Sequence, residues 1–344
     1  MVILLKIVVQ KYGGSSVADK EKIEKICDNI ISYANKDTKL VIVVSAQGKT
    51  TDNLMKTANE YSKNPVKREL DLLLTTGEIQ TVALLSLMLN EKGYKSIGLT
   101  GEQAGILSDS TYGNATIKTI YIGNILNHLN EGKIVIVAGF QAVDKFGNIT
   151  TLGRGGSDLS AVAIASALKA NKCEIYSDID GIFSADPRII PKAKLLKKIS
   201  YNEMLEAASA GAKVLHNRSV NIGKKHDIPI HVKNSQKHVC KGSIVEKILN
   251  TTMSGEESDK NFEDYEIKFI TKKDDISKIS IIGDMVMSNK EAIIKIFDIA
   301  YEENITIYMI SFSELAVSII VDKDKSEIFM KKLHDSLIEN KKNI

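Results

Sequence analysis

The stretch Thr150-Thr151-Leu152-Gly153-Arg154-Gly155-Gly156-Ser157-Asp158 combines three glycines, a guanidinium, a serine hydroxyl and a carboxylate, and it leads into an apolar helical segment at residues 159–168. Glycines let the backbone approach a ligand and adopt positive φ angles, and the N-terminus of a helix attracts negative charge. Arg154 can bind a carboxylate or phosphate through two parallel hydrogen bonds. Asp158 would lie one helical turn away on the same side. We interpret the stretch as an anion-binding turn; the alternative is an ordinary glycine-rich turn before a helix.

Two common phosphate-binding motifs do not fit this chain. The dinucleotide fingerprint would need a glycine where Asp158 stands, and a Walker loop ending in Gly48-Lys49-Thr50 would need a glycine in place of Val43. We therefore expect neither a Rossmann dehydrogenase nor a P-loop NTPase.

A second candidate anion site follows the first predicted strand, residues 2–10. Lys11 comes next, followed by Gly13, Gly14 and Ser15 and then by a helix at about 19–34 whose isoleucines share one face. A strand, a glycine-rich turn and a helix together favour anion binding. In isolation, Lys11 would more simply be a solvated lysine at a strand end, but the adjacent Gly13-Gly14-Ser15-Ser16 favours the anion site.

Buried strands alternate with helical segments over most of the chain, which indicates a mostly parallel sheet with helices on both faces. The further strands are expected at 40–44, 96–100, 133–138 and 173–177, with a hairpin at 140–151 that turns at Gly147-Asn148, and with closing strands at 229–232 and 242–246. Ligands bind such sheets at the carboxyl ends of the strands. Lys11, Ser45 and Ser177 share that position, so we expect them to contribute to one site.

Two helical residues, Glu78 and His216, remain open to two interpretations. Thr76 is expected as the N-cap of a helix reaching about residue 90, where Glu78 either complements the helix dipole or binds a ligand. Helices are also expected from Tyr201 and Gly211, the second carrying Lys213 and His216. His216 is most simply a packed histidine.

The composition is that of an ordinary globular protein of about two domains. The chain has 344 residues, 43% hydrophobic and 26% charged residues, and a net charge of only +3, which argues against a dedicated nucleic-acid binder. Its three cysteines form no CxxC pair and suggest a reducing compartment, and its histidines show no zinc spacing. The apolar run at 2–9 is too short to span a membrane.

Residues 249–262 turn polar and are expected to link two domains. Beyond them the pattern predicts a lone strand at 265–270. It then predicts a small α+β module with strands at 276–282, 305–310 and 315–321 and helices at 289–302 and 325–339.

Four colinear motifs resemble those of the aspartate kinases. They are residues 11–17, 152–158, 177–181 and 185–188, and the tail is similar to a regulatory ACT domain, most closely at 309–314. The resemblance implies an open αβα sandwich of the amino-acid kinase type over residues 1–248. It also implies a linker at 249–262 and an ACT-like domain at 263–344.

The resemblance also implies a reaction, in which ATP phosphorylates the β-carboxylate of L-aspartate in the cytoplasm. It assigns catalysis to Lys11 and Asp158, and aspartate binding to Ser45, Thr51, Glu78, Arg154 and Ser157. The implied ATP-binding residues are Lys11, Gly13, Gly14, Ser15, Ser177, Asp178, Phe183, Asp186, Arg188 and Lys213. Mg²⁺ is expected to bridge phosphate oxygens without a protein cage of its own. The expected partners are these substrates and a second copy of the chain bound through the C-terminal domain, with no nucleic acid and no membrane.

The chain departs from the family pattern in several places. Phe183 stands for a frequent tyrosine, Asn217 for a frequent proline, the tail has one ACT unit rather than two, and residues 284–289 lack a frequent Pro-Gly. Weakened or absent control by lysine is therefore expected. Two other functions stay open: a kinase of another carboxylate such as N-acetylglutamate, and a catalytically silent sensor of amino acids.

Overall fold

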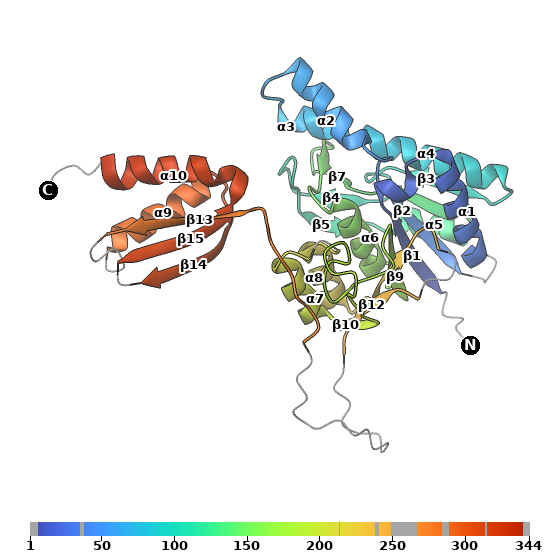
Figure 1. The fold of residues 1–344 in the computed structure, drawn as a ribbon. Helices are drawn as coiled ribbons and strands as arrows, with labels where there is room; N and C mark the ends of the chain where they lie inside the picture. The colour runs from blue at the N-terminus through green and yellow to red at the C-terminus, as the bar shows by residue number, and fades with distance from the viewer. Residues whose placement is uncertain are drawn as a thin grey trace, which may run out of the picture. The chain divides into compact units, whose positions relative to one another are not determined.

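The computed structural model describes residues 6–34, 38–212, 214–237, 241–248, 267–283, 289–313 and 315–339 (Figure 1). The chain forms two compact units, Met1–Thr271 and Lys272–Ile344. The predicted linker at 249–262 lies outside the described residues. Residues 267–270 are not a strand of the tail as expected, because Ile270 donates its backbone N–H to the Ser184 carbonyl at 2.9 Å and Lys268 pairs with Glu203 at 2.9 Å in the first unit.

An eight-stranded sheet forms the centre of the first unit, in the order β10-β12-β11-β9-β1-β2-β6-β3. Its strands are β1 (Ile7–Tyr12), β2 (Lys39–Val44), β3 (Ser96–Leu99), β6 (Ile134–Ala138), β9 (Lys172–Ser177), β10 (Lys198–Ser200), β11 (Ile230–Asn234) and β12 (Ser243–Glu246). Neighbouring strands are parallel except β11 and β12. The predicted, mostly parallel sheet is confirmed.

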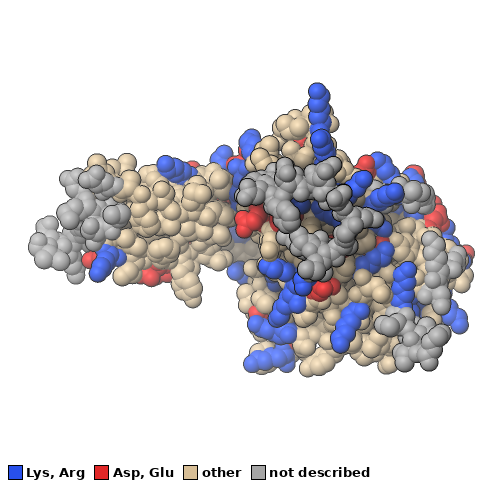
Figure 2. All heavy atoms as spheres, turned by 90° about the horizontal axis from the view of Figure 1, so that it is seen from below, with Lys and Arg blue, Asp and Glu red and all other residues tan. Residues whose placement is uncertain are grey.

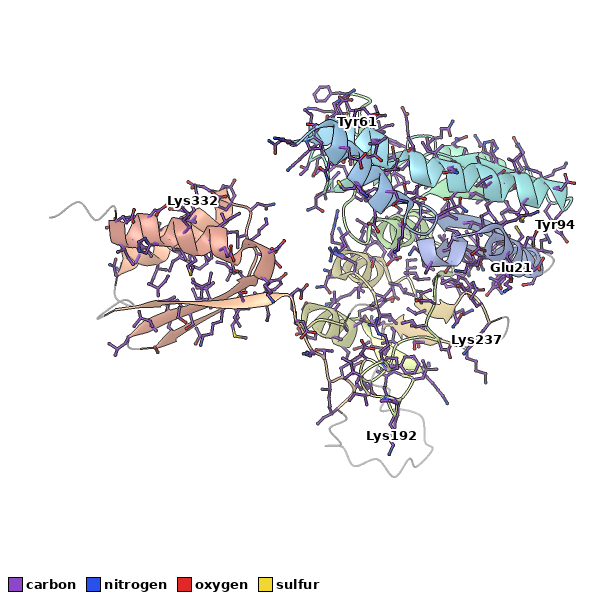
Figure 3. All side chains as sticks on the ribbon, turned by 45° about the horizontal axis from the view of Figure 1, so that its top comes forward. Glu21, Tyr61, Tyr94, Lys192, Lys237 and Lys332 are labelled. Carbon is purple, nitrogen blue, oxygen red and sulfur yellow. The ribbon has the colours of Figure 1, made fainter. Side chains whose placement is uncertain are left out.

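Helices cover both faces of this sheet. The helices of the first unit are α1 (Lys20–Ala34), α2 (Thr50–Tyr61), α3 (Lys67–Leu74), α4 (Thr76–Glu91), α5 (Gly123–Asn130), α6 (Gly156–Ala167), α7 (Tyr201–Ser209) and α8 (Asn217–His226), and a 3₁₀ turn, η1 (Gly14–Val17), precedes α1. Side chains alternate along a strand, so Val8 packs into one core with α1 and α4, and Val9 into another with α5, α6 and α8. This is the expected αβα sandwich. Figure 3 shows Tyr61 at the end of α2 and Tyr94 just after α4.

A second, smaller sheet in the first unit has the order β5-β4-β7-β8. Its strands are β4 (Ile106–Ser108), β5 (Ile117–Ile120), β7 (Gln141–Val143) and β8 (Ile149–Thr151), and β7 pairs antiparallel with β8. The predicted hairpin is confirmed, and β8 is followed directly by the glycine-rich stretch.

Several predicted boundaries were wrong. β1 ends at Tyr12, so Lys11 lies inside the strand, and α6 begins at Gly156 rather than at residue 159. The second of the two later helices begins at Asn217 rather than at Gly211. Thr76 is not an N-cap: its hydroxyl donates to the Leu73 carbonyl at 2.7 Å because the preceding residue is already helical, so α3 runs into α4.

The joined helical stretch Lys67–Glu91 is long and apolar enough, by length and composition alone, to cross a membrane. In this fold 44% of its most apolar window is buried, and Val82, Leu85 and Leu89 pack into the core on one face of the sheet. A core helix of this kind passes the same test, so the stretch is only weak evidence for a membrane span.

The second unit consists of β13 (Ile276–Ile282), α9 (Lys290–Glu302), β14 (Ile307–Ser313), β15 (Ala316–Asp322) and α10 (Ser326–His334), followed by a π-helical turn (Asp335–Glu339). Its antiparallel sheet has the order β13-β15-β14. The sheet packs against the two helices through a core that includes Ile296, Val317, Ile319 and Phe329. The predicted α+β module is confirmed in its element order. The segment 284–288, which contains most of the stretch without Pro-Gly, lies outside the described residues.

Candidate active site

The residues predicted for catalysis and aspartate binding line one cavity of about 290 Å³ in the first unit. Its walls are formed by Lys11, Ser45, Thr51, Glu78, Phe140, Gly153, Arg154, Gly155, Gly156, Ser157 and Asp158. They come from β1, the turn after β2, the starts of α2 and α4, the segment between β6 and β7, and the loop and first turn of α6. The carboxyl ends of neighbouring parallel strands meet at one edge of the sheet, so residues far apart in sequence converge there.

Lys11 and Asp158 form an ion pair at this edge, with 2.6 Å between Lys11 Nζ and Asp158 Oδ1. Lys11 lies in β1 between Val43 of β2 and Ile175 of β9. Asp158 lies in the first turn of α6. Both side chains are mostly buried, with 13% and 15% of their surfaces exposed, so the pair holds the ammonium group at the cavity wall.

The backbone of the stretch 150–158 requires glycine at positions 153 and 155. Gly153 and Gly155 have φ angles of 76° and 71°, in the left-handed region that favours glycine. A Cβ atom on Gly155 would lie 2.7 Å from the Cβ of His216. Arg154 stands between these two glycines in the sequence and lines the cavity just before α6.

His216 is a packed residue, as its simpler interpretation had it. Its ring accepts the backbone N–H of Arg218 at 3.2 Å and so caps the N-terminus of α8. Burial, with Arg218 nearby, lowers the pKa of His216.

Glu78 is buried, with 3% of its surface exposed. One carboxylate oxygen accepts the Ala46 backbone N–H at 3.1 Å, and the other has no hydrogen-bond partner among the described residues. Burial raises the pKa of Glu78 to about 7. A buried carboxylate without a cation is costly, and an ammonium group in the cavity would complete its bonding.

Sequence reasoning missed Phe140, which lies between β6 and β7 in the chain and lines the cavity. Its φ angle of 68° is unusual for a residue other than glycine, and its backbone N–H bonds to Ser160 Oγ at 3.1 Å. No spacing rule marks such a residue, because its position depends on the contact between the hairpin and α6.

The predicted nucleotide-binding residues other than Lys11 lie outside the set that lines this cavity, and their role stays a prediction. Gly13 and Gly14 adjoin it: a Cβ on Gly13 would lie 3.3 Å from Lys11 Nζ, and one on Gly14 would lie 2.7 Å from the Ala46 carbonyl oxygen. Ser15 is exposed in η1.

The remaining predicted nucleotide-binding residues follow β9. Ser177 ends that strand, Asp178 is exposed, and Phe183 forms a bridge with Leu195. Asp186 pairs with Arg188 at 2.7 Å, and 83% of the Arg188 side chain is exposed. Lys213 lies outside the described residues.

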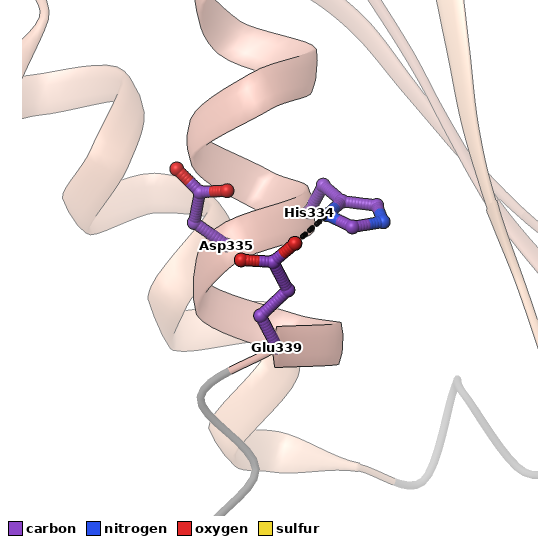
Figure 4. Close-up of side chains that lie close together, drawn as sticks. All are labelled: His334, Asp335 and Glu339. Carbon is purple, nitrogen blue, oxygen red and sulfur yellow. Dashed lines mark ion pairs between the residues drawn. The ribbon is translucent and has the colours of Figure 1, made fainter.

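The cavity offers no ready cage for a divalent metal ion among its described lining residues. Its two carboxylates are Glu78 and Asp158, and the second is paired with Lys11. Elsewhere in the described chain, the one His/Asp/Glu group close enough to hold a metal is His334, Asp335 and Glu339 at the end of α10 (Figure 4). His334 and Glu339 there are exposed and 3.6 Å apart, and an exposed group of this kind is common without a metal.

Charged side chains are mixed over the surface that Figure 2 shows. Lys and Arg are scattered over this face of the first unit, with Asp and Glu between them. This distribution agrees with the small net charge of +3.

Comparison with known proteins gives a consistent result. Residues 6–234 match the amino acid kinase family, and residues 279–337 match an ACT domain. The aspartokinase of Geobacillus stearothermophilus is 37% identical, covering 96% of this chain and 97% of the relative.

Solved structures agree with that comparison. The aspartate kinase of Synechocystis is 31% identical with a TM-score of 0.65, covering 96% of this chain and 69% of its own. E. coli aspartokinase III in complex with aspartate and ADP has a TM-score of 0.71 at 23% identity, covering 92% of this chain and 79% of its own, and so shows the shared fold.

Proposed function

We infer the function from the premise that this chain belongs to the aspartokinases, within the amino acid kinase family. It transfers the γ-phosphoryl group of ATP to the β-carboxylate of L-aspartate and gives 4-phospho-L-aspartate. This reaction is the first step of lysine, threonine and methionine biosynthesis in the family.

One observation supports this function best: the Lys11–Asp158 ion pair shares a cavity with Arg154 and Glu78. A free amino acid carries an α-carboxylate and an ammonium group, which match a guanidinium and a buried carboxylate. Arg154 would bind the α-carboxylate, and Glu78 the ammonium group. The cavity wall also carries hydroxyl groups that would bond to the same ligand, from Ser45, Thr51 and Ser157.

The attacking group needs no general base, because the β-carboxylate of aspartate is already ionised at neutral pH. Catalysis then rests on positioning and on neutralising charge at the phosphoryl group. Lys11 would stabilise that charge, and Asp158, 2.6 Å away, would orient Lys11. The backbone at Gly13 and Gly14 would lie beside the phosphates.

The nucleotide would occupy the surface beside the cavity, near the loops after β9. The residues proposed to contact it are Ser15, Ser177, Asp178, Phe183, Asp186, Arg188 and Lys213. Mg²⁺ would be held mainly by phosphate oxygens, since the described cavity wall provides only one carboxylate that is not paired with a lysine.

Hydroxylamine trapping tests the proposed function directly. With saturating ATP and Mg²⁺, L-aspartate should yield a hydroxamate, and N-acetylglutamate should not. A hydroxamate from N-acetylglutamate instead would identify a kinase of another carboxylate. Binding of amino acids without any hydroxamate or ADP release would identify a silent sensor.

We also propose a cytoplasmic homodimer joined through the second unit. In the described part of that unit β13 and β14 are the outer strands of the sheet, and Ile282, Met309 and Phe312 are exposed at 78%, 59% and 44%. Open sheet edges and exposed apolar side chains favour pairing with a second copy. Sedimentation of the full chain tests this.

A further inference from the structure

Two charged residues outside the cavity hold the strand that leads into the glycine-rich loop. We propose that Asp71 of α3 and Arg218 of α8 are positioning residues for aspartate binding, which act by fixing the backbone that carries Arg154. This inference rests on the proposed function, because it assigns the grip on aspartate to Arg154.

Asp71 holds β8 from the side of α3. Its Oδ2 accepts the backbone N–H groups of Thr151 at 2.8 Å and Gly113 at 2.9 Å, and its Oδ1 accepts the Thr151 hydroxyl at 2.8 Å. The side chain is 1% exposed. Each carboxylate oxygen therefore has a partner, and these partners belong to two segments that are distant in sequence.

Arg218 of α8 holds Leu152, the residue after Thr151. Its guanidinium donates to the carbonyl oxygen of Leu152 at 2.6 Å, to that of Ala115 at 2.7 Å and to Asn114 Oδ1 at 3.2 Å. These acceptors are uncharged, so the guanidinium is half-buried without the benefit of a carboxylate at these contacts. Burial lowers the pKa of Arg218.

The two residues thus join the same pair of segments, 113–115 and 151–152. The turn at Gly113-Asn114 lies against the glycine loop, because a Cβ on Gly153 would be 2.7 Å from Asn114 Oδ1 and 3.1 Å from the Gly113 carbonyl oxygen. Gly153 is the residue after Leu152 and the residue before Arg154. Its left-handed backbone is therefore held between a fixed strand and a fixed turn, immediately before the residue that should bind aspartate.

The expected effect is on aspartate rather than on ATP. A displacement of about 1 Å in a positioned group can reduce a rate on the order of 10²-fold. Loss of one of two supports should cost less, so we expect Asp71→Ala and Arg218→Met each to raise the KM for aspartate on the order of tenfold. The KM for ATP should stay within about twofold, because both residues support the glycine loop rather than the loops after β9.

Conservative variants separate positioning from stability. Asp71→Asn can still accept two N–H groups and donate to the Thr151 hydroxyl, so its KM for aspartate should stay near that of the parent. Arg218→Lys keeps the charge but loses the planar guanidinium group. Its KM for aspartate should therefore also rise, but by less than that of Arg218→Met. Arg218→Lys also carries the test if Arg218→Met does not fold.

Arg68→Met is the matched control, because Arg68 also bonds the β7–β8 hairpin, at Asn148 Oδ1 with a distance of 2.9 Å, but away from the loop. Its KM for aspartate should be unchanged. The double variant Asp71→Ala/Arg218→Met should raise KM by less than the product of the single effects, because both residues act on one backbone segment.

The inference is overturned if folded Arg218→Lys and Asp71→Ala proteins keep the parental KM for aspartate and only lose thermal stability. It is also overturned if the KM values for aspartate and ATP rise together. Hydroxamate formation by the parent protein is measured first, so a failure of the proposed function is seen before any variant is compared.

Discussion

Glu78 should make this protein less stable than it could be, and Glu78→Gln should reveal the cost. Burial raises the pKa of Glu78 from an ordinary 4.5 to about 7. The folded protein therefore keeps a proton on Glu78 that the unfolded chain releases above about pH 4.5. Stability falls as the pH rises from about 4.5 to about 7 and then stays low. At about 1.36 kcal/mol per pH unit, this difference corresponds to roughly 3 kcal/mol.

Glutamine has the same shape and no charge, so Glu78→Gln should remove this penalty. Denaturant unfolding of the ligand-free protein should show a gain of up to about 3 kcal/mol at about pH 8 and little gain near pH 5. The transition that belongs to the first unit should be followed, because two units need not unfold together. In activity assays the variant should bind aspartate far more weakly, and the parent's KM for aspartate should rise as the pH falls below about 7.

Glu174 supplies a control of opposite sign. Glu174 is completely buried, and Lys233 and Lys172 each lie 2.7 Å from its Oε1. Burial alone would raise the pKa of Glu174, but these two lysines lower it to about 2. The charge of Glu174 stabilises the fold above about pH 4.5, and this stabilisation is lost as the pH falls towards about 2. Glu174→Gln should therefore destabilise the protein at about pH 8 by roughly 3 kcal/mol. A Glu78→Gln protein that is no more stable than the parent at this pH would refute the reasoning.

Four further predictions concern Lys11 and Arg154, the glycine loop, dimerisation and control by free lysine. Lys11→Ala should lower kcat on the order of 10²–10³-fold with a smaller change in the KM for aspartate, whereas Arg154→Ala should mainly raise that KM. Steady-state kinetics measures both, and a kcat of Lys11→Ala within a few-fold of the parent would contradict the role of Lys11. Gly155→Ala should lose aspartate binding, because the new Cβ would lie 2.7 Å from the His216 Cβ, and calorimetric titration measures it. Truncation after residue 271 should shift the protein from dimer towards monomer in sedimentation. Lysine titrated against the full-length enzyme should leave activity nearly unchanged, and strong inhibition at sub-millimolar lysine would show that the tail still regulates.

Much of the fold could be predicted from the sequence, because strand and helix periods were clear in the first unit and the tail. Boundaries were less predictable where tertiary contacts decide them. Thr76 looks like an N-cap by type, yet α3 already supplies a helical backbone at Thr75. The segment 267–271 has an apolar pattern that suits a strand, but its contacts with Ser184 and Glu203 place it on the first unit.

The candidate site was predictable for residues that stand at strand ends or in glycine-rich turns. Lys11, Glu78 and Arg154 fall into these classes or lie close to a helix start, and they line one cavity. Asp71 and Arg218 could not be found this way, since each lies in an unremarkable helical pattern and its partners are mostly backbone atoms. Only the folded arrangement of α3, β8 and α8 shows what they contact.

The position of β1 has a consequence for how the chain is made. β1 pairs with β2, which begins at Lys39, and with β9, which begins at Lys172. A ribosome-bound chain that has not yet reached β9 leaves one edge of β1 uncovered, although β1 is one of the two middle strands of the finished sheet. Uncovered edges invite aggregation. Because Asp158 belongs to the segment just before β9, the Lys11 ion pair also forms late. Recovery of kinase activity during refolding should therefore follow closure of the sheet and lag behind the formation of helices, as expected for contacts of long sequence separation.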